Sequence, residues 1–248
     1  MALFGRQVWV EVGTRKLEGL RVSFRAHLDR SGTPNTASIE VYNCAPGTIL
    51  LAQDPASVVR LVAGYDTPRA IFVGNPTKHG VVVTKQGPDR ILKLELQDGG
   101  HQLATARIDI GYQTEVSVSQ ILDTLIAKLG LPRGVIQVSD DKRFPHGVTL
   151  RGPVREVLDR IAVMSAQGKA GWFVRDGALY LLPHNAGTAE QAIEVSVDRG
   201  NLIGSPGPKD EGIEVTTLLD PGIRPGRTVV VKSERVDGTY GARGRLRR

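Results

Sequence analysis

The sequence predicts a β-rich α+β fold in which β-barrel-like domains carry a small inserted α/β domain. Its 29 Gly and 14 Pro are scattered over 248 residues, which indicates many turns. Apolar residues alternate with period two in the first 110 residues, change to a helical period near residue 117, and return to strand patterns after about residue 186. We therefore expect an N-terminal β-barrel-like domain (1–110), a separable α/β domain (111–186), and a C-terminal β segment (187–248) that forms a second or completing barrel and ends in a basic tail.

The strands of the first part are predicted by alternation. Residues 20–28 alternate apolar and polar side chains at every position, as a half-buried strand requires because successive side chains face opposite sides of the sheet. Leu92, Leu94 and Leu96 repeat this pattern. β-branched or aromatic runs between turn residues predict further strands at 38–42, 70–73 and 81–84. One or two helical turns are compatible with residues 54–61, where Pro55 suits the first position.

The middle part contains two amphipathic helices. Ser117 and Gln120 make a capping-box start for the first helix, and Gly130 makes its stop. Its apolar stripe is Val118, Ile121, Leu122, Leu125, Ile126 and Leu129. The second helix opens at Pro153, ends before Gly168 and carries five apolar side chains: Val154, Val157, Leu158, Ile161 and Met164. Of these, Val157, Leu158 and Ile161 are expected to face inward.

Strand patterns flank these helices. A strand is expected at residues 135–139, and Asp176-Gly177 suits the type I′ turn of a hairpin over residues 171–182. After the α/β domain, strands are expected at 194–197, 212–219 and 227–236. No inward charge or strand proline is evident, so we expect strand edges that are open to pairing between subunits.

Composition excludes several classes of protein. No apolar run approaches the ~20 residues that a membrane span needs, so no membrane partner is expected. The first six residues lack the apolar core of a signal peptide. A lone Cys44 excludes an internal disulfide framework and a cysteine-only metal site, and we expect it to be a small buried residue at a strand end.

The positive charge is concentrated in the last 25 residues. Residues 224–248 hold eight Lys or Arg against two acidic residues, which accounts for the whole net charge of +6. Gly241 and Gly244 are expected to break any helix or strand there. The sequence therefore predicts a mobile or partner-ordered interaction tail, not a nucleic-acid-reading face, with the candidate residues Arg243, Arg245, Arg247 and Arg248.

Catalytic and cofactor patterns do not occur in the sequence. The five histidines lie 22 or more residues apart, so none forms a helical zinc pair, and His27 falls on the polar face of a strand. No nucleophile elbow, dinucleotide loop or phosphate loop is present. Asp140 and Asp141 are adjacent, and we interpret them as loop residues. Solvated positions are expected for Asp109, Asp123, Asp159 and Glu156. We expect no catalytic residue, cofactor or metal.

The aromatic residues of the hairpin allow two interpretations. Trp172 and Tyr180 could stack on a single-stranded nucleic acid or a sugar. Packing on the helix beneath is favoured, because both residues flank apolar side chains and aromatic residues make up only 5% of the chain.

An ordered series of short motifs resembles the baseplate hub proteins of contractile and related phage tails. These motifs include Leu-Ile-Gly-Ser-Pro at 202–206, Leu-Leu-Asp-Pro at 218–221 and Arg-Pro-Gly-Arg at 224–227. Earlier stretches follow the same order along nearly the whole chain: 10–13, 17–24, 33–43, 71–75, 86–89 and 94–99. The chain departs from the pattern after residue 240, where eight residues rich in Gly and Arg follow.

The resemblance implies a function in assembly. It implies tail-tube-like β-barrel domains and a structural hub in the virion, made in the host cytoplasm, that joins the tail tube to the central spike. Implied partners are two further copies in a homotrimer, tail tube or distal tail proteins, the central spike protein and the tape-measure protein, with DNA only passing through the channel. Two alternatives stay open: a nucleic-acid-binding β-barrel protein that uses the basic tail, and a peptidoglycan-cleaving tail enzyme.

Overall fold

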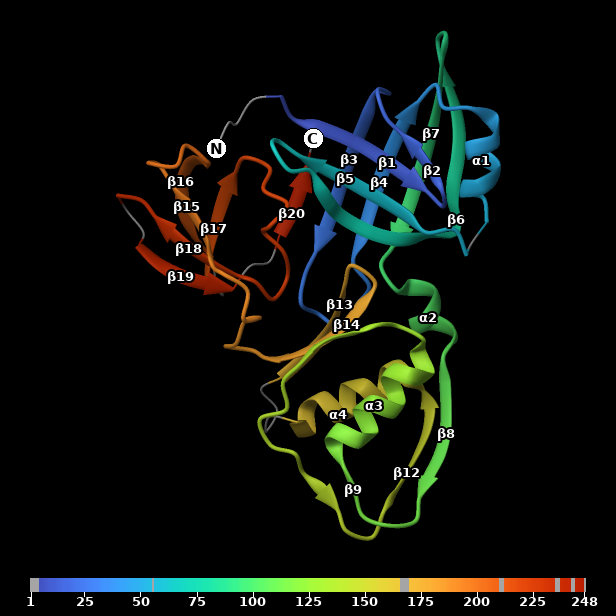
Figure 1. Ribbon diagram of the computed structural model, residues 1–248, viewed down its shortest axis with the longest axis vertical. Helices are drawn as coiled ribbons and strands as arrows, with labels where there is room; N and C mark the ends of the chain where they lie inside the picture. Colours follow the sequence, from blue (N-terminus) through green and yellow to red (C-terminus); the bar gives the residue numbers. More distant parts are fainter. Residues whose placement is uncertain are drawn as a thin grey trace.

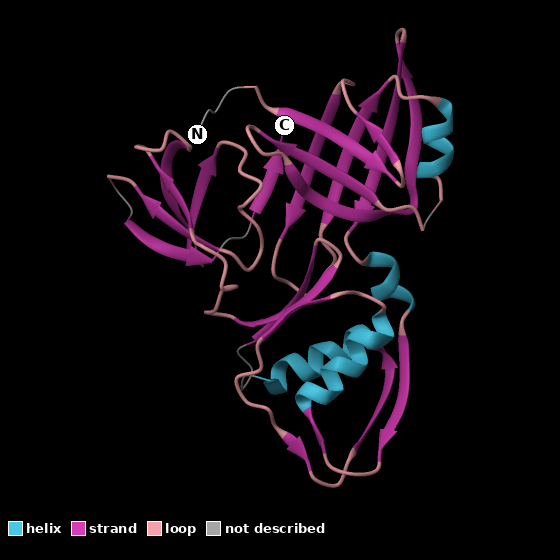
Figure 2. Cartoon of the chain, viewed as in Figure 1, coloured by secondary structure: helices cyan, strands magenta, loops and turns pink. Residues whose placement is uncertain are grey.

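The structure is a computed structural model that describes residues 5–54, 56–165, 170–209, 212–234, 237–241 and 244–247. It contains an N-terminal β unit, a middle unit that holds two long helices, and a smaller C-terminal β unit beside the first (Figure 1). Helices are confined to the middle unit apart from one short helix at the outside of the N-terminal β unit (Figure 2). The predicted β-rich α+β fold class is confirmed.

The N-terminal β unit is one eight-stranded sheet that curves around a core. Its strand order is β2-β1-β5-β6-β7-β4-β3-β20. β6 has 18 residues, and it pairs with β5 through its first part and with β7 through its second part. β1 and β5 therefore cross in front of β3 and β4 (Figure 1). The strands are β1 (Gln7–Val12), β2 (Arg15–Leu17), β3 (Val22–Leu28), β4 (Thr36–Tyr42), β5 (Val59–Gly64), β6 (Arg69–Gln86), β7 (Asp89–Gln97) and β20 (Gly244–Arg247).

The core of this unit follows the predicted alternation. In β3 the side chains of Val22, Phe24, Ala26 and Leu28 are buried, whereas His27 is exposed as expected. Leu92, Leu94 and Leu96 of β7 are also buried. The runs 70–73 and 81–84, predicted as two strands, are parts of the single strand β6. In the described residues β2 and β20 do not pair with each other, so the sheet is barrel-like but not closed.

The prediction of one or two helical turns at residues 54–61 is wrong. The helix of this region, α1, spans Pro46–Ala52, and β5 begins at Val59. Pro46 supplies the helix start that we assigned to Pro55, which lies outside the described residues. The Asp54 carboxylate accepts a hydrogen bond from the Ala56 amide at 2.9 Å, a local turn that ends the helical path.

The middle unit packs its helices against two small sheets. α3 and α4 lie between the three-stranded sheet β10-β14-β13 and the pair β12-β8, and a short pair β11-β9 lies beside them (Figures 1 and 2). Its hydrophobic cluster already includes Leu103 and Ile108, which precede the predicted boundary at residue 111. The elements are α2 (Gly100–Thr105), β8 (Arg107–Tyr112), β9 (Val116–Ser117), α3 (Val118–Leu129), β10 (Arg133–Ile136), β11 (Arg143–Phe144), β12 (Val148–Pro153), α4 (Val154–Ser165), β13 (Ala170–Arg175) and β14 (Ala178–Pro183).

The predicted ends and inward faces of the helices are largely confirmed. Ser117 and Gln120 form the capping box, and Gly130 ends α3 in the left-handed conformation at φ 69°. All six residues of the predicted α3 stripe are buried. In α4 the three residues predicted to face inward, Val157, Leu158 and Ile161, are buried, and so is Val154, whereas Met164 is 36% exposed. The buried residues of the last turn of α4 are Ala162 and Ser165. Gly168 lies outside the described residues.

The predicted hairpin turn is confirmed by its backbone angles. Asp176 and Gly177 have φ values of 56° and 78°, and a type I′ turn requires positive φ at both central residues. β13 pairs with β14 in register on either side of this turn. The turn points out of the middle unit toward the N-terminal β unit (Figure 1).

The C-terminal β unit has a small core. It consists of a three-stranded sheet, β15-β18-β19, and a two-stranded ribbon, β16-β17. Among the described residues its buried hydrophobic cluster holds Val195, Val229 and Val231, and Ile193 is buried as well, whereas Val197 and Ile203 are 64% and 48% exposed. The strands are β15 (Ile193–Ser196), β16 (Leu202–Lys209), β17 (Gly212–Thr217), β18 (Thr228–Lys232) and β19 (Asp237–Gly241).

Some strand edges are protected, contrary to expectation. β2 is three residues long and exposes Arg15 and Lys16, and β16 contains Pro206 and Pro208. Short charged edges and prolines are devices that block edge-to-edge pairing. The expectation of unprotected edges is therefore wrong for these two strands.

Candidate functional site

The predicted candidates for chemistry do not come together. Within the described ranges, no group of three or more His, Cys, Asp or Glu could hold a metal ion. Asp141 accepts a hydrogen bond from the Ser119 amide at 2.9 Å at the start of α3, and this bond lowers the pKa of its carboxyl group. Cys44 is buried, and burial raises the pKa of its thiol. Asp141 therefore supports the start of α3, and Cys44 is a buried packing residue.

The basic tail was expected to be mobile or ordered by a partner, without helix or strand, and this expectation is wrong for residues 244–247. Residues 244–247 form β20, which pairs with β3 and places Arg245 opposite His27 and Arg247 opposite Arg25. Gly241 and Gly244 lie within strands, because a ladder uses backbone groups and does not require a side chain at each position. Arg243 and Arg248 lie outside the described residues.

Of the hairpin aromatics, Trp172 packs on the helix beneath, as favoured from the sequence, whereas Tyr180 is half-buried and packs within the hairpin. Trp172 is 2% exposed and donates a hydrogen bond from Nε1 to Oδ1 of Asp159 in α4, at 2.7 Å. Tyr180 stacks on Phe173 with ring centroids 5.3 Å apart. The Tyr180 hydroxyl accepts a hydrogen bond from Arg175 at 2.9 Å. The buried Trp172 ring therefore offers no free stacking face of the kind that binds bases, and the Tyr180 ring already stacks on Phe173.

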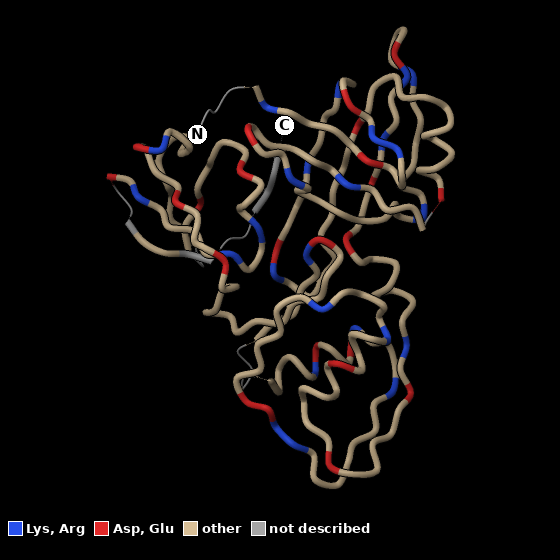
Figure 3. Tube along the Cα trace, viewed as in Figure 1, with Lys and Arg blue, Asp and Glu red and all other residues tan. Residues whose placement is uncertain are grey.

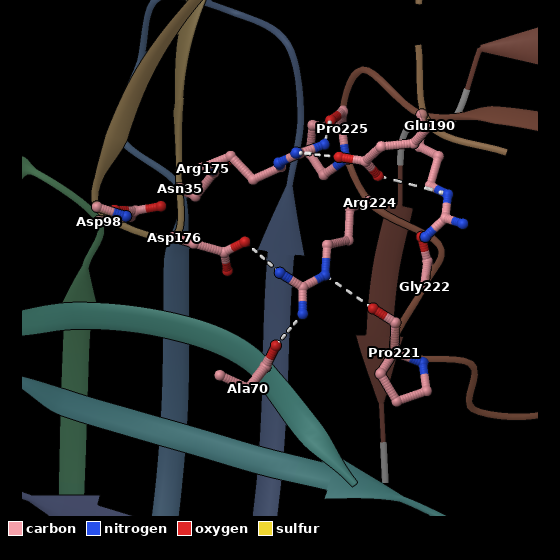
Figure 4. A network of polar contacts seen from close by, with 12 residues as sticks. Asn35, Ala70, Asp98, Arg175, Asp176, Glu190, Pro221, Gly222, Arg224 and Pro225 are labelled. Carbon is pink, nitrogen blue, oxygen red and sulfur yellow. Dashed lines mark hydrogen bonds and ion pairs between the residues drawn. The ribbon is translucent and has the colours of Figure 1, made fainter. Parts of the chain in front are cut away.

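A network of polar contacts lies where the three units meet, and we call it the junction (Figure 4). Its centre is Arg224, in the loop between β17 and β18. The Arg224 guanidinium binds the Asp176 carboxylate of the hairpin turn and the Ala70 carbonyl of β6, and its Nε donates to the Pro221 carbonyl at 2.7 Å. One side chain thus connects all three units.

A second guanidinium, that of Arg175, is buried beside the first. Its side chain is 8% exposed, and it donates to the Pro225 carbonyl at 3.1 Å and to Oε1 of Glu190 at 2.7 Å. Burial lowers the pKa of Arg175, but the bonds to Glu190 and Tyr180 outweigh it and hold the pKa above its usual value. The arginine therefore stays charged and fixes the loop at Pro225 on β13.

Two more arginines extend the junction. Arg30 donates to the carbonyls of Ala186 and Pro183 at 3.0 and 2.9 Å, which attaches the N-terminal β unit to the chain that leaves β14. Arg227 donates to the Gln191 carbonyl at 2.9 Å. Lys and Arg are otherwise spread among acidic residues over all three units (Figure 3). In the junction, arginine guanidinium groups mainly donate hydrogen bonds to backbone carbonyl oxygens. A Lys ammonium group cannot reproduce this planar arrangement of several donors.

The Arg-Pro-Gly-Arg motif owes its glycine to close packing. Gly226 has φ 82°, and a Cβ atom there would lie 2.8 Å from Cζ of Phe173. Any larger residue would push the loop away from β13 and separate Arg224 and Arg227 from their acceptors. The motif that carries the resemblance is therefore a structural element of the junction.

Sequence reasoning missed most of the junction. Arg175 follows the apolar run Trp172-Phe173-Val174, and a charged residue at the end of a buried strand is a signal that could have been used. Asp98, Asn35 and Glu190 carry no comparable signal, since their partners are 79, 139 and 15 residues away along the chain.

The comparisons with known proteins concern the fold. No model of a protein family matches the sequence, and no curated protein matches it. A tail protein of Neisseria meningitidis MC58 is similar in structure, with a TM-score of 0.64 and 12% identity over 96% of this chain and 90% of that chain. A 43 kDa tail protein of prophage MuSo2 from Shewanella oneidensis has a TM-score of 0.56 and 11% identity over 81% of this chain. This chain spans 60% of the length of that protein.

A third similar structure belongs to a secretion machine. It is an Escherichia coli component of the type VI secretion system, described as structurally similar to the bacteriophage T4 tail proteins gp27 and gp5. Its TM-score is 0.56, with 13% identity over 92% of this chain and 68% of that chain. The fold of this chain is therefore that of phage tail proteins. None of the described helices is long and apolar enough to cross a membrane.

Proposed function

We propose that this chain is a structural protein of a phage tail or of a phage-derived injection device. Its place is the baseplate of the virion, where it acts as the hub that joins the tail tube to the central spike. The observation that carries the proposal is the fold, which matches a tail protein over 96% of the chain at a TM-score of 0.64. The ordered motifs of the sequence support the same assignment.

The junction gives the proposal a mechanical basis. A hub transmits force between its neighbours, so its units must keep their relative positions. Arg224, Arg175 and Arg30 hold the three units together through short bonds to buried or half-buried acceptors, which are stronger than pairs of neutral groups. In this proposal the chain has no catalytic role.

The partners in this proposal are two further copies of the chain, arranged as a homotrimeric ring, with tail tube or distal tail proteins on one side and the central spike on the other. The tape-measure protein and DNA pass through the channel. The C-terminal β unit suits a contact with neighbouring proteins. Its described hydrophobic cluster is small (Val195, Val229 and Val231), while Val197 and Ile203 are exposed. Partner surfaces commonly contain such apolar residues.

A mass measurement of the purified protein, alone and with its tail neighbours, tests the ring. The proposal expects a species with the mass of three chains, present at least when the neighbouring tail proteins are supplied. Because the C-terminal β unit exposes the apolar side chains of Val197 and Ile203, we expect the contacts between copies to use this unit. Val197→Asp with Ile203→Asp should abolish the trimer, whereas Val163→Asp in α4, an equally exposed site at 57%, should leave it unchanged. A monomer under all conditions contradicts the ring.

A further inference from the structure

A buried carboxyl group at the junction is not explained by mechanical support alone. Asp98 follows β7 directly, in the segment that leads into the middle unit, and it is 2% exposed. Its backbone N–H donates to the Asn35 carbonyl at 2.9 Å, and its Oδ1 accepts a hydrogen bond from the Gly177 amide at 3.1 Å. The carboxyl group therefore connects the N-terminal β unit to the hairpin turn of the middle unit.

The groups that face Asp98 come from every element packed around it. Asp176 of the turn, Arg175 of β13 and Arg224 of the β17–β18 loop line one small cavity with Asp98 and Asn35. The cavity volume is about 10 Å³, which is close to the space that one water molecule needs. Figure 4 shows Asp98 and Asn35 on one side of this cluster and the two arginines on the other.

Both arginines of the cluster already have other acidic partners. Arg224 binds Asp176, and Arg175 binds Glu190. In the part of the chain that the structure describes, Asp98 has hydrogen bonds but no ion pair. Burial first, and the nearby Asp176 second, raise the pKa of Asp98 to about 7.

We propose that Asp98 and the Asp176–Gly177 turn form a proton-operated latch between the N-terminal β unit and the middle unit. With Asp98 neutral, the site holds one carboxylate, that of Asp176, and Arg224 balances it. When Asp98 releases its proton to solvent, two carboxylates share a site whose charges were balanced. Hydrogen bonds from Gly177, Asn35 and Asp176 favour the ionised form, but the burial of the charge and the repulsion from Asp176 outweigh them. The turn therefore withdraws so that the Asp98 carboxylate reaches water, and the middle unit moves about its connections at Gly99 and at residues 184–187.

The direction of the pH effect follows from linkage. The usual pKa of an Asp is 3.8, and that of folded Asp98 is about 7, so between these values the closed latch holds a proton that an opened one has released. Stability of the closed form therefore falls as the pH rises through this window, and the loss is complete above about pH 7. The latch is closed at acidic pH and loosens as the pH approaches about 7. This expectation does not depend on whether the hub proposal is correct.

Amide hydrogen exchange of the full chain tests the latch, with rates corrected for the intrinsic effect of pH. In the wild type, the peptide that contains Gly177 should lose protection roughly tenfold or more between about pH 5 and about pH 7, while the α3 peptide keeps its protection. Asp98→Asn keeps a neutral group of the same shape and should show no such loss. Asp109→Asn, at an exposed carboxylate in the same unit, should behave as the wild type does.

Two results would overturn the latch. One is constant protection of the turn in the wild type across this range, and the other is an unchanged loss of protection in Asp98→Asn. The latter would assign the response to one of the five histidines, which ordinarily titrate in this range. If Asp98→Asn does not fold, Asp176→Asn decides: removing the second carboxylate should move the midpoint of the wild-type transition to lower pH, and an unmoved midpoint contradicts the proposal.

Discussion

Leu122→Ala tests whether the middle unit is stabilised by the packing of α3. Leu122 is 0% exposed and lies in the middle of α3, within the cluster that also contains Val157 and Leu158 of α4. Truncation to Ala removes three buried carbon atoms and leaves a cavity between the two helices. Leu→Ala changes at such sites cost about 2–5 kcal/mol, so we expect a loss of unfolding free energy in this range.

Urea denaturation followed by the fluorescence of Trp172 measures this loss. A Trp9→Phe background isolates the signal, because Trp9 lies in β1 and Trp172 lies in β13 of the middle unit. The matched control is Leu50→Ala in α1, where the side chain is 70% exposed and the expected change is within about 0.5 kcal/mol. A loss below about 1 kcal/mol for Leu122→Ala at an unchanged denaturant slope would refute the packing assigned to α3.

Three further predictions concern single features. Ser117→Ala removes the capping box of α3 and should cost about 0.5–2 kcal/mol in the same urea assay; no change would show that the cap is not formed. Arg175→Met leaves the Glu190 carboxylate and the Pro225 carbonyl without this partner and should cost about 1.5–3 kcal/mol, whereas Arg151→Met, 81% exposed in its side chain, should cost about 0–1 kcal/mol. Replacing Arg243, Arg245, Arg247 and Arg248 by Ser should barely alter a DNA affinity that is already weak at physiological salt; strong binding with a salt slope of about −0.9 per phosphate contact, lost in this variant, would favour the nucleic-acid-binding alternative.

Local patterns in the sequence predicted the elements whose structure depends on near neighbours. The α3 stripe, its capping box and the Asp176-Gly177 turn are each decided within a dozen residues or fewer. Alternation in residues 20–28 predicted β3 for the same reason. The helix near residue 54 failed because two prolines, Pro46 and Pro55, offer equivalent starts, and only the sheet pairing of β5 decides between them.

Long-range contacts account for what the sequence did not predict. β20 pairs with β3 across more than 200 residues, and no local signal shows that a strand rich in Gly and Arg will find that edge. The junction is similar, since Arg224 reaches Ala70 over 154 positions. The resemblance did identify the loop that carries Arg224, but it did not indicate that this loop holds three units together.

Electron cryomicroscopy of assembled tails tests the central claim most directly, with the chain labelled so that it can be located. The hub proposal predicts three copies around the tail axis at the tip of the tube, directly above the spike, with the curved sheet of each N-terminal β unit facing the channel. Single copies off the axis, or copies in the capsid, would contradict it.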